Sequence, residues 1–159
     1  MSWTKTLGSV FLAMAATMPA VANQNLWQSL SLKNALVYKQ GNGKKQVAMI
    51  TALNCGYCRL LEQELTKMDD ITIYKFITPI QGGYSQSVSV WCSADRNKAY
   101  AKVLLRQEQI QMSSCNNPIA SNLAWFYKNK LVGAPALIST KGEIRYGVTS
   151  KEELIKWLN

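Results

Sequence analysis

The sequence predicts one mixed α/β domain. Its 159 residues, 48 % hydrophobic and 17 % charged, suit a single globular domain with a substantial core. The mostly apolar run Gln46–Leu53 is typical of a buried strand, and the alternating, β-branched run Ile71–Thr78 indicates another. Between these runs, Leu61, Leu65 and Met68 recur at helical spacing on one face. Strands and helices that alternate in this way are typical of α/β folds.

The first 22 residues have the pattern of a signal peptide. Lys5 gives a positively charged start, Leu7–Met18 is an apolar stretch, and Ala20-Val21-Ala22 supplies the small residues of a cleavage site. An uncleaved membrane anchor is the alternative, but Leu7–Ala22 is shorter than the roughly 20 residues that a spanning helix needs. We therefore expect residues 1–22 to be removed after Ala22 and the protein to be exported.

A polar segment and two strands are predicted between the signal peptide and the first helix. Residues 23–34 are a polar lead-in that is too short to be a domain. Ala35–Gln40 is predicted to be a strand, and the glycines within residues 41–44 indicate a turn before the strand Gln46–Leu53. A helix then opens at a Cys-x-x-Cys motif and is predicted to run to Met68.

The middle of the chain is predicted to be largely helical. Pro79 closes the strand Ile71–Thr78, and the Gly- and Ser-rich residues 80–90 are expected to be a loop that leads into a helix. Ala94–Gln109 is predicted to be one helix. Pro118–Lys130 is predicted to be another, because its apolar residues recur at helical spacing.

The chain is predicted to end in a hairpin and a helix. Pro135–Thr140 and Glu143–Val148 are expected to pair as strands about a turn at Lys141-Gly142. Ser150 and Glu153 have the spacing of a capping box, which predicts the start of the last helix.

Residue counts exclude several classes of function. The sequence has no histidine, which excludes Ser-His and Cys-His nucleophilic catalysis and histidine-ligated zinc. It also excludes haem attachment through Cys-x-x-Cys-His, since Arg59 follows Cys58. The 18 Lys and Arg residues outnumber the 9 acidic ones, but they are scattered, with Lys44-Lys45 the only adjacent pair. We therefore expect no nucleic-acid binding.

The motif Cys55-Gly56-Tyr57-Cys58 carries the predicted chemistry. It follows a buried strand and opens a helix, so the Cys55 thiol can sit where unpaired N–H groups and the helix dipole stabilise a thiolate. Cys58, one turn on, can attack a mixed disulfide and release the bound partner. Gly56 leaves room for a substrate backbone. The alternatives are a structural bridge and half of a zinc site.

The other two cysteines, Cys92 and Cys115, flank the predicted helix Ala94–Gln109. Four-cysteine zinc sites usually contain two close pairs, and these residues lie too far apart to form one, so we expect no metal. An oxidising compartment permits a disulfide between them, which would stabilise the fold by about 3 kcal/mol in the simple chain-entropy treatment. Two buried free thiols are the alternative.

Several segments match one family in order and spacing. They are Val37-Tyr38-Lys39, Asn54–Cys58, Trp91–Ala99, Ser114-Cys115 and Gly133–Ala136. Together they resemble the catalytic domain of the periplasmic disulfide isomerases DsbC and DsbG, over about Leu36–Trp157. The resemblance implies a thioredoxin-like fold with a helical insertion at about residues 80–118, so that residues 35–159 form the catalytic domain. It also implies a periplasmic location.

The resemblance implies roles for the matching residues. Cys55 becomes the attacking thiol and Cys58 the resolving thiol, within the active-site loop that includes Gly56 and Tyr57. Cys92–Cys115 becomes a structural disulfide. Pro135 becomes a cis-proline facing the active site, and a client would lie extended beside Ala134-Pro135. No cofactor is implied beyond the dithiol itself.

The sequence departs from the family at two places. Ala134 stands where DsbC-like proteins commonly carry threonine, a residue that tunes the potential and the release of bound partners. Asn23–Asn34 stands where those isomerases carry a dimerisation domain, so we expect a monomer. A stand-alone catalytic domain also resembles the small DsbC-like proteins encoded with conjugation systems, which help to fold the disulfide-bonded proteins of the transfer machinery.

We therefore predict an exported thiol-disulfide oxidoreductase, a disulfide isomerase or reductase. Its expected partners are unfolded or misoxidised exported proteins and a membrane redox partner. The alternatives are a dithiol oxidase and a non-catalytic periplasmic chaperone or assembly factor, including one for a conjugation apparatus. Tyr57, Tyr84 and Trp91 either add apolar contact area for clients or belong to the core.

Overall fold

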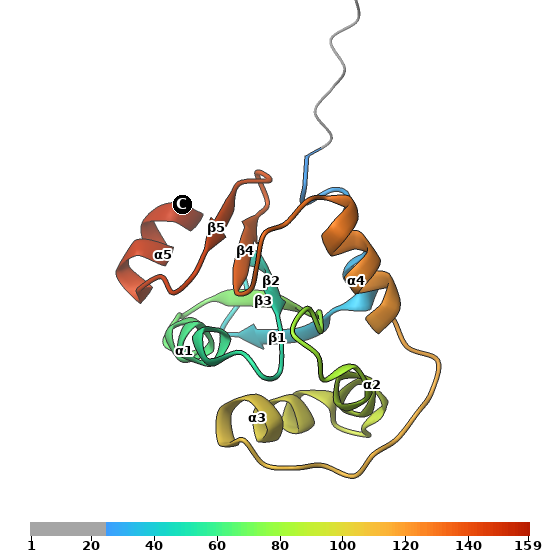
Figure 1. Ribbon diagram of the computed structural model, residues 1–159. Coiled ribbons are helices and arrows are strands. Elements are labelled where there is room, and N and C mark those ends of the chain that lie inside the picture. The colour runs from blue at the N-terminus through green and yellow to red at the C-terminus, as the bar shows by residue number, and fades with distance from the viewer. Residues whose placement is uncertain (1–24) are drawn as a thin grey trace, which may run out of the picture.

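A five-stranded mixed sheet lies at the centre of the computed structural model, which describes residues 25–159 (Figure 1). The strand order is β1-β3-β2-β4-β5, with β2 and β3 parallel and the other neighbours antiparallel. The strands are β1 (Leu36–Gln40), β2 (Lys45–Thr51), β3 (Ile71–Ile77), β4 (Ala136–Ser139) and β5 (Ile144–Tyr146). The predicted signal peptide at residues 1–22 lies outside the described residues.

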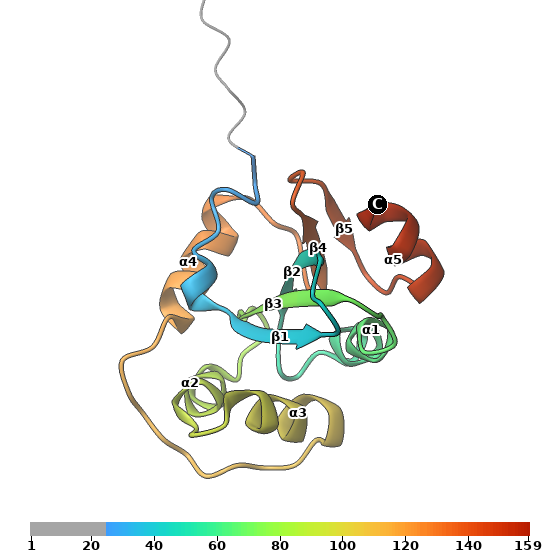
Figure 2. The same ribbon diagram turned by 180° about the vertical axis from the view of Figure 1, so that it is seen from behind.

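Helices cover both faces of this sheet, as the two opposite views show (Figures 1 and 2). They are the 3-10 turn η1 (Leu32–Asn34) and the helices α1 (Gly56–Leu65), α2 (Tyr84–Cys92), α3 (Arg96–Arg106), α4 (Ile119–Lys128) and α5 (Lys151–Leu158). In the described part of the chain, no helix is long and apolar enough to cross a membrane.

The alternation of side chains along β2 builds a core on each side of the sheet. Val47 and Met49 pack with residues of α1, α2, α3 and α5 in one apolar cluster. Ala48 and Ile50 pack on the opposite face with Phe126 of α4 in a second cluster. Because both faces are covered, β2 is apolar and buried from Val47 to Ile50, which is the pattern that predicted a buried strand.

The lead-in before β1 is part of the second cluster. Leu30 is buried there, and the Trp27 ring meets Tyr74 of β3 edge to face, with 5.8 Å between centroids. The indole Nε1 of Trp125 in α4 donates a hydrogen bond to the Ser29 carbonyl at 3.1 Å. Figure 2 shows this segment in blue, lying against α4. These contacts make the lead-in an integral part of the domain.

The prediction of a loop at residues 80–90 is wrong for most of that range, because helix α2 begins at Tyr84. Serine hydroxyls make this Ser-rich segment compatible with a helix by bonding back to carbonyls one turn earlier. Ser87 Oγ donates to Gly83 O and Ser89 Oγ donates to Ser85 O, both at 2.9 Å. The hydroxyls therefore satisfy their own hydrogen bonds within the helix.

The predicted helix Ala94–Gln109 is shorter than expected at both ends. Asp95 caps it, since the carboxylate accepts a hydrogen bond from Lys98 N at 3.0 Å, and helical residues begin at Arg96. At the other end, Gln107 adopts a left-handed conformation (φ 56°) that stops the helix after Arg106. Residues 107–118 then run as an irregular segment to α4.

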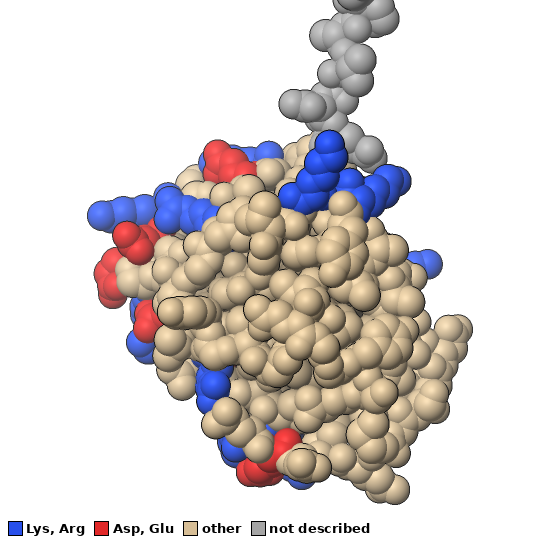
Figure 3. Space-filling model, viewed as in Figure 1, with Lys and Arg blue, Asp and Glu red and all other residues tan. Residues whose placement is uncertain are grey.

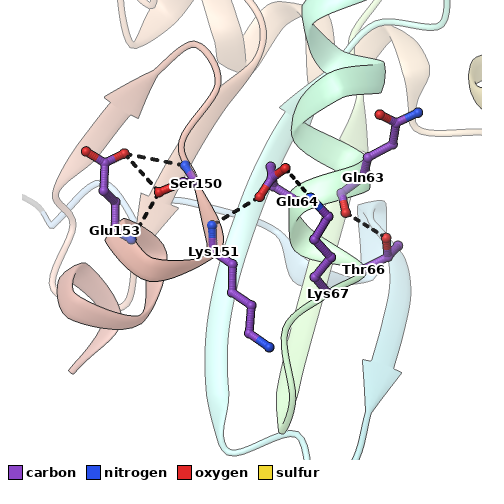
Figure 4. A network of polar contacts seen from close by, with 7 residues as sticks. All are labelled: Gln63, Glu64, Thr66, Lys67, Ser150, Lys151 and Glu153. Atoms are coloured by element: carbon purple, nitrogen blue, oxygen red, sulfur yellow. Dashed lines mark hydrogen bonds and ion pairs between the residues drawn. The ribbon is translucent and has the colours of Figure 1, made fainter.

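The closing helix α5 docks on α1 through a small polar network (Figure 4). The predicted capping box of Ser150 and Glu153 is confirmed. The backbone N–H of Lys151 donates to the Glu64 carboxylate of α1 at 3.1 Å. A hydrogen bond from Lys67 lowers the pKa of this Glu64 carboxyl. This network fixes the end of the chain against the helix that carries the Cys-x-x-Cys motif.

Candidate active site

Cys55 lies where the carboxyl end of β2 passes into α1. It is the N-cap of α1, and its Sγ accepts a hydrogen bond from Cys58 N at 3.1 Å. Cys55 and Cys58 form a disulfide with 5.2 Å between their Cα atoms. Cys58 is fully buried, whereas Cys55 keeps 6 % of its surface exposed. Cys55 is therefore the more exposed cysteine of the pair.

The start of α1 provides the electrostatics of the site. The first N–H groups of a helix have no carbonyl partners within it, and they carry the positive end of the helix dipole. In the reduced protein, this field and the Cys58 N–H favour the thiolate of Cys55. The arrangement can generate a nucleophilic sulfur without histidine, which this sequence lacks.

The structure brings the Ala134-Pro135 segment directly beside Cys55. The Ala134 carbonyl oxygen lies 3.7 Å from Cys55 Sγ, although the two residues are 79 positions apart in sequence. The Ala134–Pro135 peptide bond is cis, and β4 begins at the next residue. The segment is held in turn by β5, since Gly147 N donates to Pro135 O at 3.0 Å.

The surface beside Cys55 includes exposed motif residues and one nearby charge. The Arg59 guanidinium lies close to Gly56, since its Nη2 is 3.8 Å from the position that a Cβ would take there. Gly56 and Tyr57 are exposed, with Tyr57 at 69 %. Asn54 Nδ2 donates to Gln81 O at 2.8 Å and so joins the motif to the loop that precedes α2. Tyr84, at the start of α2, is also exposed. Trp91 differs, because it is buried and the Arg96 guanidinium lies 4.0 Å from the centre of its ring.

A buried charged cluster, which the sequence pattern did not predict, includes a residue of the motif's own helix α1. Glu62, one turn after Cys58 on α1, forms an ion pair with Lys75 of β3, and both side chains are buried. The Lys75 ammonium also lies 4.7 Å and 4.8 Å from the ring centres of Tyr38 and Tyr100. The signal available in the sequence was a lysine at an inward position of a β-branched strand.

Tyr100 of α3 completes this cluster. Its hydroxyl donates to Glu62 Oε2 at 3.4 Å and lies 3.1 Å from Thr51 Oγ1. Burial raises the pKa of Tyr100 well above its usual value, and the neighbouring Glu62 charge raises it further. The protonated Tyr100 side chain thereby connects helix α3 of the insertion to the core of the domain through its hydrogen bonds.

Cys92 and Cys115 are joined by a disulfide with 5.7 Å between their Cα atoms. The bond ties the end of α2 to residues 107–118, and Cys115 lies on the surface. All four cysteines of the sequence are thus paired. Within residues 25–159, no group of His, Cys, Asp and Glu side chains is arranged to hold a metal ion.

Comparisons with known proteins agree with this architecture. A family model described as a thioredoxin-like domain matches residues 32–159. The crystal structure of a disulfide interchange protein from Neisseria gonorrhoeae superposes with a TM-score of 0.75 and 31 % sequence identity. That alignment covers 81 % of this chain and 98 % of the other. The expected thioredoxin-like fold is confirmed.

Curated relatives carry the name that the resemblance suggested. The probable thiol:disulfide interchange protein DsbC of Bordetella avium is 32 % identical over 149 residues, covering 88 % of this chain and 54 % of the relative. DsbC of Salmonella typhimurium is 29 % identical over 147 residues, covering 87 % and 62 %. The chain spans about half the length of the curated relatives it matches. The resemblance to DsbC is confirmed.

Proposed function

Because the chain belongs to the thioredoxin-like domain family, we propose that it is an exported thiol-disulfide oxidoreductase that acts on proteins. The observation that carries this proposal is the position of Cys55, which caps α1, is the more exposed cysteine of its pair and faces the Ala134 carbonyl. The names of the disulfide interchange relatives support the same chemistry.

The proposed reaction starts from the reduced dithiol. The Cys55 thiolate attacks one sulfur of a client disulfide, which forms a Cys55–client disulfide and releases the other client sulfur as a thiolate. Cys58 then loses its proton and attacks Cys55 Sγ. This step forms the Cys55–Cys58 disulfide and releases the second client sulfur, so the client gains two electrons. In isomerisation, the freed client thiolate attacks a different client disulfide before Cys58 acts, which forms one new client disulfide and releases another client thiolate. That thiolate attacks the client sulfur of the Cys55–client disulfide, which closes a second client disulfide and releases the Cys55 thiolate, so the dithiol is regenerated with no net transfer of electrons.

Gly56 and the Ala134-Pro135 segment form the proposed binding surface for the client backbone. Gly56 places no side chain beside Cys55, and the Ala134 carbonyl is available as a hydrogen-bond acceptor next to the reacting sulfur. Backbone contacts of this kind have little sequence preference, which suits unfolded or misoxidised exported proteins as clients. A membrane redox partner would return the pair to its reduced state, and the periplasm is the proposed compartment.

The reductive direction is proposed over the oxidative one. The motif Cys55-Gly56-Tyr57-Cys58 and the domain around it resemble the DsbC isomerases, and the motif lies within the region that the DsbC relatives match. The redox state of Cys55–Cys58 in the host, trapped by acid and read by thiol alkylation, tests this. A mostly reduced pair supports the proposal, and a fully oxidised pair makes the protein a dithiol oxidase.

Insulin reduction by dithiothreitol separates a catalyst from a chaperone. The wild-type protein is expected to speed the reaction, whereas a chaperone without redox activity only keeps the product soluble. Cys55→Ser is expected to abolish the acceleration, and Cys58→Ser is expected to accumulate mixed disulfides at Cys55. Cys92→Ser is the matched control, since it removes a sulfur away from the site and should retain part of the turnover. Equal activity of wild type and Cys55→Ser would contradict the proposal.

A further inference from the structure

An uncharged groove lies between the start of α2 and residues 107–118. Its volume is about 460 Å³, and the side chains that line it are Tyr84, Ser85, Val88, Met112, Ser113 and Ser114. Val88 is buried at the groove, whereas Tyr84 and Met112 are 44 % and 61 % exposed. The groove therefore presents an aromatic ring and a thioether to solvent beside a buried aliphatic side chain, with hydroxyl groups around them.

The wall formed by residues 107–118 is held in place rather than free. Ser89 is fully buried in α2, and its Oγ accepts a hydrogen bond from Ser113 N at 3.0 Å. The same Oγ lies 3.6 Å from Met112 Sδ. Cys115, two positions after Ser113, is disulfide-bonded to Cys92 at the end of α2. A wall fixed in this way costs little ordering entropy when a ligand binds.

The loop before α2 connects the Cys-x-x-Cys motif to the groove. Asn54, which precedes Cys55, is hydrogen-bonded to the carbonyl of Gln81, and Gln81 lies three residues before Tyr84. In Figure 3, Lys, Arg, Asp and Glu side chains gather along the upper, left and lower left edges of the molecule. The broad area over α2 and α4 shows no charge. The groove itself therefore presents no charge to a client segment, whereas the Arg59 guanidinium lies beside Gly56 at the motif.

We propose that this groove binds an apolar side chain of the client segment whose disulfide reacts with Cys55. The occupant is an extended, unfolded stretch of the client, and the inference rests on the proposed function. A charged side chain would lose water in the groove without gaining an ionic partner, so it is disfavoured. Met112 adapts its shape to different rings and aliphatic groups, which gives a preference for apolar side chains without a strict sequence requirement.

Two probe peptides of equal length test the proposal. Each carries one cysteine as a mixed disulfide with 2-mercaptoethanol, and the flanking residues are phenylalanine in one peptide and aspartate in the other. The reduced wild-type protein is expected to react with the phenylalanine peptide on the order of tenfold faster, a ratio typical of a hydrophobic pocket. Met112→Asp should remove this preference. Met112→Leu, which keeps an apolar side chain, should retain it.

Gln111→Asp is the matched control. It places the same new charge one residue away on the same exposed segment, but Gln111 does not line the groove. This variant should keep the preference for phenylalanine. Equal preferences in Met112→Asp and wild type would overturn the proposal, and so would an equal loss in Gln111→Asp and Met112→Asp.

Two further measurements separate failure of the groove from failure of the proposed function. Exchange with oxidised 2-mercaptoethanol, which has no flanking residues, reports the chemistry of Cys55 alone and should be unchanged in Met112→Asp. Its absence in wild type would refute the proposed function. Fluorescence anisotropy of labelled, cysteine-free versions of both peptides on the oxidised protein then decides the groove independently. Tighter binding of the phenylalanine peptide to wild type than to Met112→Asp supports the groove, and equal binding refutes it.

Discussion

Removing one partner of the buried Glu62–Lys75 pair is expected to destabilise the domain strongly. Both side chains are buried, and the pair is closed in by the Tyr100 hydroxyl and by the rings of Tyr38 and Tyr100. In Lys75→Met, the Glu62 carboxylate loses its cation and retains only the Tyr100 hydroxyl at 3.4 Å. One hydrogen bond from a neutral phenol does not compensate for the desolvation of a carboxylate.

The expected loss is about 3–5 kcal/mol of unfolding free energy, the range found when one member of a buried ion pair is removed. For a domain near this size, each kcal/mol lowers the thermal midpoint by roughly 2–4 °C, so a fall of about 6–20 °C is expected. The double variant Glu62→Met with Lys75→Met removes both charges. Its stability should return close to that of wild type, because apolar side chains of similar volume replace a buried pair at little cost.

Urea unfolding followed by circular dichroism measures these differences for the wild type, both single variants and the double variant. The slope of the transition should stay constant, so that midpoints compare stabilities directly. A loss below about 1 kcal/mol in Lys75→Met would show that the pair behaves as a solvated one. A double variant as unstable as the single variants would show that packing around the methylene groups, rather than charge, determines the loss.

Three smaller perturbations follow from other contacts. The raised pKa of Tyr100 means that the unfolded chain ionises first above pH 10, so wild-type stability should fall by about 1.4 kcal/mol per pH unit from this group. Tyr100→Phe should remove that part of the slope in urea titrations across pH 9–11, and an unchanged slope would contradict the assignment. Ser150→Ala breaks the capping box with Glu153 and should cost about 1 kcal/mol in the same assay, whereas Ser150→Asp should retain most of the stability. Gly142→Ala should cost about 1–2 kcal/mol, because Gly142 has φ 82° and an added Cβ would clash with Asn25; a neutral effect would refute the strain.

The sequence predicted the sheet and most helices because burial on one or two faces leaves a period in the chain. The apolar run of β2 and the alternation of β3 come directly from their covered faces. The start of α2 was missed because serine favours loops on average, whereas hydroxyls that bond back to carbonyls are tolerated in a helix. The end of α3 at Gln107 was missed because a non-glycine residue in a left-handed conformation has no simple sequence signal.

The candidate site, like the fold, could be predicted from the sequence only in part. The Cys-x-x-Cys motif is local, so spacing alone identified it and placed it at a helix start. The proximity of Ala134 to Cys55 depends on the pairing of β4 with β2, and only the family resemblance suggested it. The Glu62–Lys75 pair was not foreseen because each residue, taken alone, is a single charge within an apolar pattern. The solvent exposure of Tyr57 and Trp91 depends on tertiary packing, which leaves Tyr57 exposed and buries Trp91.

The strand order also imposes a sequence of events on a chain that emerges N-terminus first. The pairings of β1 and β2 with β3 need nothing beyond Ile77, and the Cys92–Cys115 bond needs nothing beyond Cys115. β4 pairs with β2 across most of the chain length, and such distant contacts form late because a long loop must close first. Cys55 and Cys58 have therefore left the ribosome well before Ala134 can cover one side of them. During that interval, both thiols are open to the oxidants and thiols of the surroundings, and a protein that we propose to repair disulfides in others begins as a nascent chain exposed to the same hazard.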